Sequence, residues 1–271
     1  MNRKQISTLI LNRFQEEKQA LQVMFNQTKF GIGYFYIDNL LPENLAVQIY
    51  NVFPNHSDTV LKKSLKQFKH IAVQMDVYNP LLEEVIFAFQ DKEIIKLIEG
   101  ICNTSNLKPD ENLYAGGLSM MSEGHFLNPH LDNSHDKERE EWRMLNLLYY
   151  ISPNWELENG GNLELWPQGP KNSYTTIVSK FNRLVVMATH NTSWHSVSKV
   201  TVPRTRCCIS NYYFSKEPWL DNSKFHVTTF RGRPEEKLKD KVLQADAFLR
   251  NQARKFFKKS IFENPHVYKK K

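Results

Sequence analysis

Short β-like runs follow one another from Leu113 to Phe214, and turn signals separate them. The runs cover 113–121, 143–152, 162–166, 173–179, 183–188, 194–201 and 205–214. Many short strands with no helical tracts between them are typical of a jelly roll or a barrel. We therefore predict a β core over about residues 113–216. Gly160 and Gly161 fall in one of the turns, where we expect positive φ angles.

Helical periodicity dominates the chain before this β region. Apolar residues at helical spacings predict a helix over residues 3–27. An aromatic strand at 31–37 is followed by a helix at about 42–53, with a proline at its start and another just after its end. A helical tract at 81–103 has a predicted break near Asp91, whose side chain can cap the second half.

Three further segments have weaker patterns. The basic stretch 62–69 favours a loop or a short helix, whereas 71–78 alternates apolar and polar residues and predicts a strand. After Pro218 helical periodicity returns, and a helix is expected from about 235 to 259.

The predicted fold class is mainly β with flanking helices (α+β). We expect a single domain over residues 1–216, with helical support at 1–112 and the β core at 113–216. Residues 217–271 are expected to form a basic helical extension packed on the same domain.

The net charge of +7 does not belong to the body of the protein. Residues 217–271 hold 14 Lys and Arg against 7 Asp and Glu, so the rest of the chain is balanced. Because positive and negative charges balance in residues 1–216, they do not favour a catalytic face that binds along a nucleic acid. The basic tail leaves open an acidic partner, a membrane surface or a homodimer.

Composition and cysteine usage narrow the class of protein. Hydrophobic residues make up 41% of the chain, and no apolar run approaches the roughly 20 residues of a membrane span. The first residues lack the features of a signal peptide, so we expect a cytoplasmic location. Three cysteines, with no Cys-x-x-Cys, exclude a disulfide framework and a thiolate zinc site.

His130 and Asp132 form the most informative pair in the chain. Residues i and i+2 of a strand point to the same side, so both side chains can face one centre. His195 opens a later β run and can supply a second imidazole from a distant strand. Two imidazoles and one carboxylate are the facial triad that holds non-haem Fe(II) with open coordination positions. His190 remains the alternative to His195.

Several motifs resemble the Fe(II)/2-oxoglutarate-dependent dioxygenase superfamily, in its prolyl 4-hydroxylase-like branch. The resemblance covers about residues 113–215. It depends on Pro129-His130-Leu131-Asp132, Arg143-x-x-Asn146-Leu147-Leu148-Tyr149-Tyr150, Trp155 followed by Gly160-Gly161-x-Leu163, His195-x-Val197, and Arg206 through Tyr213-Phe214. It implies a double-stranded β-helix (jelly-roll or cupin-like) core with helices packed on one sheet.

The resemblance also implies Fe(II), 2-oxoglutarate as cosubstrate with O2, and ascorbate as an optional addition. The family binds the far carboxylate of 2-oxoglutarate with a basic residue on the strand after the distal His, a task that suits a guanidinium. Arg206 is preferred because its strand matches the family register, and Arg204 remains the alternative. Tyr150 matches a position whose phenol reaches the same carboxylate.

The expected activity is hydroxylation of an unactivated C–H bond, with release of succinate and CO2. The retained carboxylate of Asp132 favours hydroxylation or desaturation over halogenation. Ser122 stands where some relatives have Tyr, which weakens the expectation that the substrate is a peptidyl proline. The substrate, a protein side chain, an amino acid or a small metabolite, is not determined by the sequence. Alternatives are a nucleic-acid demethylase of the same superfamily and a cupin-like isomerase or binding module.

Overall fold

A single curled sheet of 13 strands forms the centre of the protein. The computed structural model describes residues 1–256 and 267–269. Ten strands form a continuous hydrogen-bonded path: β1 (Tyr34–Ile37), β10 (Arg183–Ala188), β7 (Trp142–Tyr150), β12 (Arg206–Ser215), β5 (Gly117–Met121), β3 (Gln67–Ala72), β6 (Phe126–Leu131), β11 (His195–Val197), β8 (Leu163–Leu165) and β9 (Thr175–Ile177). Three short strands join at the sides: β2 (Val60–Lys63) on β3, β4 (Lys108–Pro109) on β12 and β13 (Thr229–Phe230) on β6.

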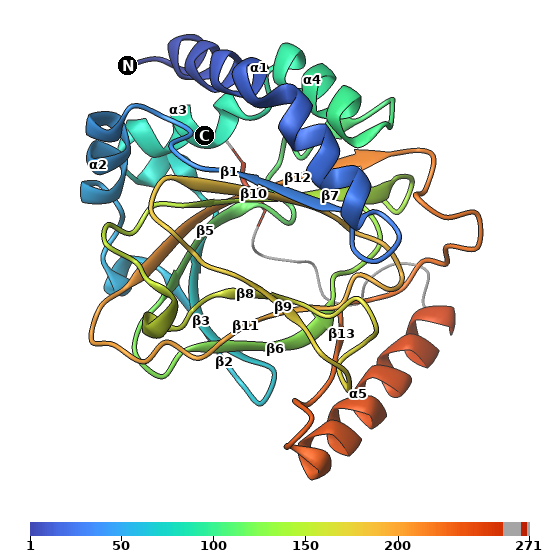
Figure 1. Cartoon of the computed structure of the whole chain (residues 1–271). Coiled ribbons are helices and arrows are strands. Elements are labelled where there is room, and N and C mark those ends of the chain that lie inside the picture. The colour runs from blue at the N-terminus through green and yellow to red at the C-terminus, as the bar shows by residue number, and fades with distance from the viewer. Residues whose placement is uncertain (257–266, 270–271) are drawn as a thin grey trace.

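All the pairings in this sheet are antiparallel, and the path bends back on itself. Strands β6, β11, β8 and β9 therefore lie opposite β1, β10, β7 and β12 as two facing layers (Figure 1). Every run that was expected to be β within 113–216 contains a strand, and β1, β2, β3, β4 and β13 join the same sheet from outside these bounds. Gly160 and Gly161 do adopt positive φ, at 66° and 65°.

Helices cover the layer that contains β1, β10 and β7 (Figure 1). They are α1 (Arg3–Thr28), α2 (Glu43–Asn51), α3 (Pro80–Ala88) and α4 (Lys92–Cys102). A capping box between Asn2 and Gln5 starts α1, which buries apolar side chains of the predicted periodicity, among them Ile10 and Phe14. The predicted break at Asp91 is confirmed, since its carboxylate accepts a hydrogen bond from the Glu93 backbone N–H.

The prediction for the segment between α2 and α3 was wrong. Residues 62–69 are not a loop or helix but most of a hairpin, in which β2 pairs with β3. The predicted strand at 71–78 ends at Ala72 and gives way to the 3-10 turn η2 (Met75–Val77). Two other 3-10 turns are η1 (His56–Asp58) and η3 (Leu157–Asn159). Pairing of β3 with β5 and β6, which are distant in sequence, decides the strand here, and local composition does not reveal such pairing.

The C-terminal helix α5 (Lys237–Phe256) lies apart from the other helices, beside β13 (Figure 1). Leu243 and Ala247 are buried, whereas Phe248 is 62% exposed. An ion pair from Arg233 to the buried Glu164, 2.7 Å long, ties the segment before α5 to β8. These contacts favour the predicted packing of the extension on the same domain. The predicted helix end near 259 lies outside the described residues.

No helix in the described part of the chain combines the length and apolarity needed to cross a membrane. Cys102, Cys207 and Cys208 are buried and form no disulfide.

Candidate active site

A cavity of about 860 Å³ opens between the two layers of the sheet. Its wall is built from β3, β5, β7 and β12 on one side and from β6, β8 and β11 on the other, with α5 at its edge. Cavities that bind small molecules usually measure about 300–1,000 Å³. The space is therefore large enough for two small molecules side by side.

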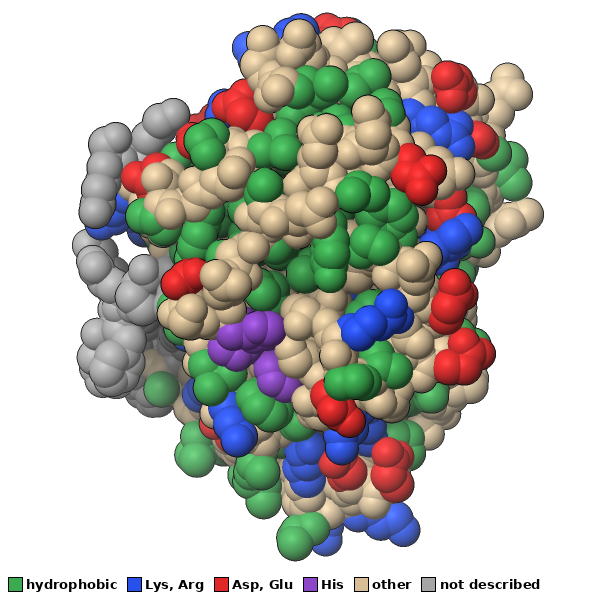
Figure 2. Space-filling model, turned by 90° about the vertical axis from the view of Figure 1, so that its left-hand side faces the viewer, with side chains coloured by type: hydrophobic (Ala, Val, Ile, Leu, Met, Phe, Trp, Pro, Cys, Tyr) green, Lys and Arg blue, Asp and Glu red, His purple; other side chains and the backbone are tan. Residues whose placement is uncertain are grey.

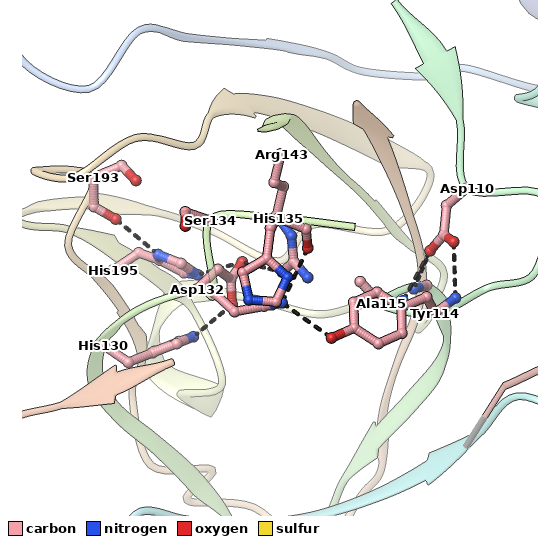
Figure 3. A network of polar contacts seen from close by, with 12 residues as sticks. Asp110, Tyr114, Ala115, His130, Asp132, Ser134, His135, Arg143, Ser193 and His195 are labelled. Atoms are coloured by element: carbon pink, nitrogen blue, oxygen red, sulfur yellow. Dashed lines mark hydrogen bonds and ion pairs between the residues drawn. The ribbon is translucent and has the colours of Figure 1, made fainter. Parts of the chain in front are cut away.

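His130, Asp132 and His195 meet inside this cavity (Figure 3). His130 is near the end of β6, Asp132 follows directly after that strand, and His195 begins β11. The antiparallel register places His195 opposite His130. Their possible ligand atoms all lie within 4.8 Å of one another, so the three side chains can share one metal ion.

The two imidazoles are oriented by backbone carbonyl groups. Nδ1 of His130 lies 2.9 Å from the Asn128 carbonyl oxygen, and Nδ1 of His195 lies 3.0 Å from that of Ser193. Because a carbonyl oxygen can only accept, each Nδ1 carries the proton and each Nε2 presents its lone pair. Both Nε2 atoms face the Asp132 carboxylate, at 3.5 and 3.7 Å. This is the outer-shell support that metal-binding histidines usually have.

Asp132 is held as a carboxylate in a nearly dry environment. Burial would raise its pKa, but the adjacent His130 side chain and the Arg143 charge hold that pKa well below its usual range. Arg143 Nη1 lies 3.4 Å from Oδ2, yet Oδ2 has no hydrogen-bond partner among the described residues. A buried, ionised oxygen without a donor suits a cation. Burial and the neighbouring His130 lower the pKa of His195 to about 4, so its imidazole is neutral and able to bind metal.

Among the described residues, no other histidine joins this cluster. His190, the alternative distal ligand, occupies the turn before β11, where its Nδ1 lies 2.9 Å from the Thr192 hydroxyl. It is not among the described residues that line the cavity. His125 stacks instead on Phe68, 3.8 Å between ring centroids.

Arg206 and Arg204 have different surroundings. Arg206 starts β12, is only 3% exposed and lines the cavity. Its Nε donates to the Ser179 hydroxyl at 3.2 Å, and its guanidinium lies 4.7 Å from the centre of the Tyr150 ring. Arg204 precedes the strand, is exposed and donates to the Asn154 carbonyl. Of these two arginines, only Arg206 therefore presents its guanidinium to the cavity.

Tyr150 lies on β7, behind Arg206 rather than in the cavity wall. Its buried hydroxyl is close to Arg206 and Ser179 but has no hydrogen-bond partner within the described part of the chain. Burial raises its pKa to about 12, so the phenol stays protonated and able to donate.

Two functional side chains were missed or left undecided by sequence reasoning. Arg143 enters the sequence analysis only as part of the family motif, but in the fold it is buried beside Asp132. Lys69 was assigned to a loop or short helix, and it projects into the cavity from β3. The signal for Lys69 was its alternation with Gln67 and Ile71, which also line the cavity.

The sequence was also compared with known protein families and curated proteins. Residues 116–214 match the model of the 2OG-Fe(II) oxygenase superfamily. No curated protein matches the sequence.

Several solved structures share the fold, a double-stranded β-helix. A prolyl-4-hydroxylase from Pseudomonas putida superposes with a TM-score of 0.54 at 14% identity, covering 73% of this chain and all of that one. A Trichoplax adhaerens prolyl hydroxylase, solved with a hypoxia inducible factor peptide, gives 0.52 at 21% identity, covering 75% of this chain and 92% of its own. HygX from Streptomyces hygroscopicus, solved with nickel, 2-oxoglutarate and hygromycin B, gives a TM-score of 0.50 at 10% identity. The match covers 73% of this chain and 87% of HygX.

The family match spans both imidazoles and the carboxylate at the cavity, together with the guanidinium of Arg206. We conclude that residues 116–214 match the 2OG-Fe(II) oxygenase superfamily, and that the site they form fits a 2-oxoglutarate-dependent non-haem iron dioxygenase.

Proposed function

We propose that this enzyme hydroxylates an unactivated C–H bond of a small metabolite, an amino acid or a protein side chain, with release of succinate and CO2. His130, Asp132 and His195 hold Fe(II) in this proposal. Arg206 binds the far carboxylate of 2-oxoglutarate, and Tyr150 supports it. The observation that carries the proposal is the convergence of two Nε2 lone pairs and one ionised carboxylate within 4.8 Å.

The protein's own part in the reaction is binding, orientation and exclusion of water. Iron, with 2-oxoglutarate and O2, supplies the oxidising chemistry when it is bound. Arg143 keeps the Asp132 carboxylate ionised and pointing toward the imidazoles. Arg206 offers a planar pair of donors to a carboxylate from a buried position, where such contacts are strong.

The retained carboxylate supports hydroxylation in preference to halogenation. A halogenating enzyme of this superfamily needs the carboxylate's coordination position for chloride. Here Asp132 occupies that position with its charge maintained by Arg143 and His130.

The test is succinate production from 2-oxoglutarate by the Fe(II)-loaded protein, screened for stimulation by added amino acids, metabolites and peptides. Asp132→Ala should abolish turnover, because it removes the charged metal ligand. Asp221→Ala, in an exposed turn remote from the cavity lining, is the matched control and should retain turnover. Full turnover in Asp132→Ala would contradict the proposed ligand set.

A further inference from the structure

The wall of the cavity carries far more positive than negative charge. Its described lining contains one carboxylate, Asp132, and five basic side chains: Lys62, Lys69, Arg143, Arg206 and Arg250. Elsewhere the charges are mixed, and Figure 2 shows Lys and Arg interspersed with Asp and Glu on one outer face. The cavity lining thus carries a local excess of positive charge.

Two of these cations already have a role. Arg143 pairs with Asp132, and Arg206 faces the position proposed for 2-oxoglutarate. Arg250 bonds to Asp246 and to the Thr228 carbonyl oxygen. Each of the three guanidinium groups thus has a stated contact or role, which leaves the ammonium of Lys69 to be explained.

Lys69 reaches the cavity because of the strand that carries it. Gln67, Lys69, Ile71 and Val73 line the cavity at alternate positions, and β3 ends just before the last of them. Lys62 is the direct cross-strand neighbour of Lys69 and also lines the cavity. Like charges directly opposite each other on two strands destabilise the pair.

The Lys69 ammonium has no hydrogen bond or ion pair to any described residue. Burial lowers its pKa; Asp132 attracts the charge, whereas Arg206 and Lys62 repel it. Lys69 is half-buried, so its ammonium is partly desolvated, and a partly desolvated charge without a partner costs stability. A side chain that is costly in the free protein and directed into a reaction cavity is explained by an anion that binds there.

We propose that Lys69 binds an anionic group of the substrate, a carboxylate or a phosphate, so that the enzyme acts on a small acidic molecule. This inference rests on the proposed function. The metal and Arg206 together satisfy both carboxylates of 2-oxoglutarate, which leaves Lys69 for a second anion. The cavity of about 860 Å³ has room for that second molecule beside the cosubstrate.

The decisive experiment uses the full chain loaded with Zn²⁺, which is redox-inert and accepts imidazole and carboxylate ligands. The first calorimetric titration adds 2-oxoglutarate, and the second adds inorganic phosphate to the complex saturated with 2-oxoglutarate. Lys69→Met should bind 2-oxoglutarate like the wild type and phosphate at least tenfold more weakly. Lys69→Arg, which keeps the charge, should retain phosphate binding within a few fold.

Lys63→Met is the matched control. Lys63 lies on the same hairpin, beside the Phe68 ring, and is not among the described residues that line the cavity. It should leave both titrations unchanged. The melting temperature of Lys69→Met should not fall, because the substitution removes an unpaired charge and the repulsion by Lys62.

Two results would overturn the inference. Equal phosphate affinity in the wild type and in Lys69→Met would show that Lys69 binds no second anion. A loss of 2-oxoglutarate affinity in Lys69→Met would place Lys69 in the cosubstrate site. Failure of the wild type to bind 2-oxoglutarate in the first titration would instead contradict the proposed function, so the two failures are distinguishable.

Discussion

Replacing Arg206 by Met should weaken 2-oxoglutarate binding severely. Arg206 is 3% exposed, and the nearest groups to its guanidinium are the Ser179 hydroxyl, the Met121 sulfur and the Tyr150 ring. None of these carries a charge that could neutralise a cosubstrate carboxylate. Truncating one partner of a buried, hydrogen-bonded charge pair costs about 2–5 kcal/mol. The apparent Kd for 2-oxoglutarate should therefore rise by roughly 30- to 5,000-fold.

Lysine at this position should give an intermediate loss. The ammonium keeps the charge but lacks the planar fork that binds a carboxylate through two parallel hydrogen bonds. The Kd is measured by calorimetry on the Zn²⁺ protein, and the KM for 2-oxoglutarate is measured by succinate production on the Fe(II) protein.

Arg204→Met is the control, because Arg204 is exposed and outside the cavity. Its Kd for 2-oxoglutarate should match that of the wild type. If Arg204→Met lost more affinity than Arg206→Met, or if Arg206→Met bound normally, the assignment of the carboxylate anchor would be refuted.

Three further predictions follow from single contacts. Arg143→Met removes the cation that orients the metal-site carboxylate, so Fe(II) affinity should fall about 10- to 100-fold; an unchanged metal titration would contradict that role. In Gly160→Ala the new Cβ would lie 1.9 Å from the Lys199 carbonyl oxygen, at a φ of 66°. The free energy of unfolding, measured with denaturant, should therefore fall by at least about 1–3 kcal/mol. Gly169 also has a positive φ, but an added Cβ would meet open space, so the free energy of unfolding of Gly169→Ala should fall by only about 1–2 kcal/mol. If the two variants lost the same free energy of unfolding, the steric argument would be disproved. The Arg231 hydrogen bond lowers the pKa of Asp240, so the pair stabilises the fold above the unfolded pKa of about 3.9 and loses this effect as pH falls through the folded pKa. Asp240→Asn should therefore be less stable than the wild type at pH 7, with the difference shrinking below about pH 4.

The metal-binding set follows closely from the sequence. His130 and Asp132 are two positions apart, and that spacing sends both side chains to one face wherever the backbone is extended. The strands from 183–188 to 205–214 and the helix over 3–27 also follow from local periodicity, because each is set by residues near one another in the chain. The cap at Asp91 is local in the same sense.

Other features depend on pairing across the sheet, which no local pattern encodes. His195 and His190 differ in the fold because the strand register sets His195 opposite His130, whereas His190 is not among the described residues that line the cavity. Arg204 and Arg206 are chemically alike, and they differ only because β12 begins at the second of them. Lys69 became a cavity residue when β3 paired with β5 and β6, strands some 50 to 60 positions later.

The sequence by itself thus determined which residues are candidate metal ligands and which class of oxidant they indicate. The tertiary structure alone decided which cations surround them, because β pairing joins segments whose separation along the chain carries no local signal. The β2–β3 hairpin shows the difference most clearly, since Lys62 and Lys69 look like solvated surface charges in the sequence and face each other at the reaction cavity in the fold.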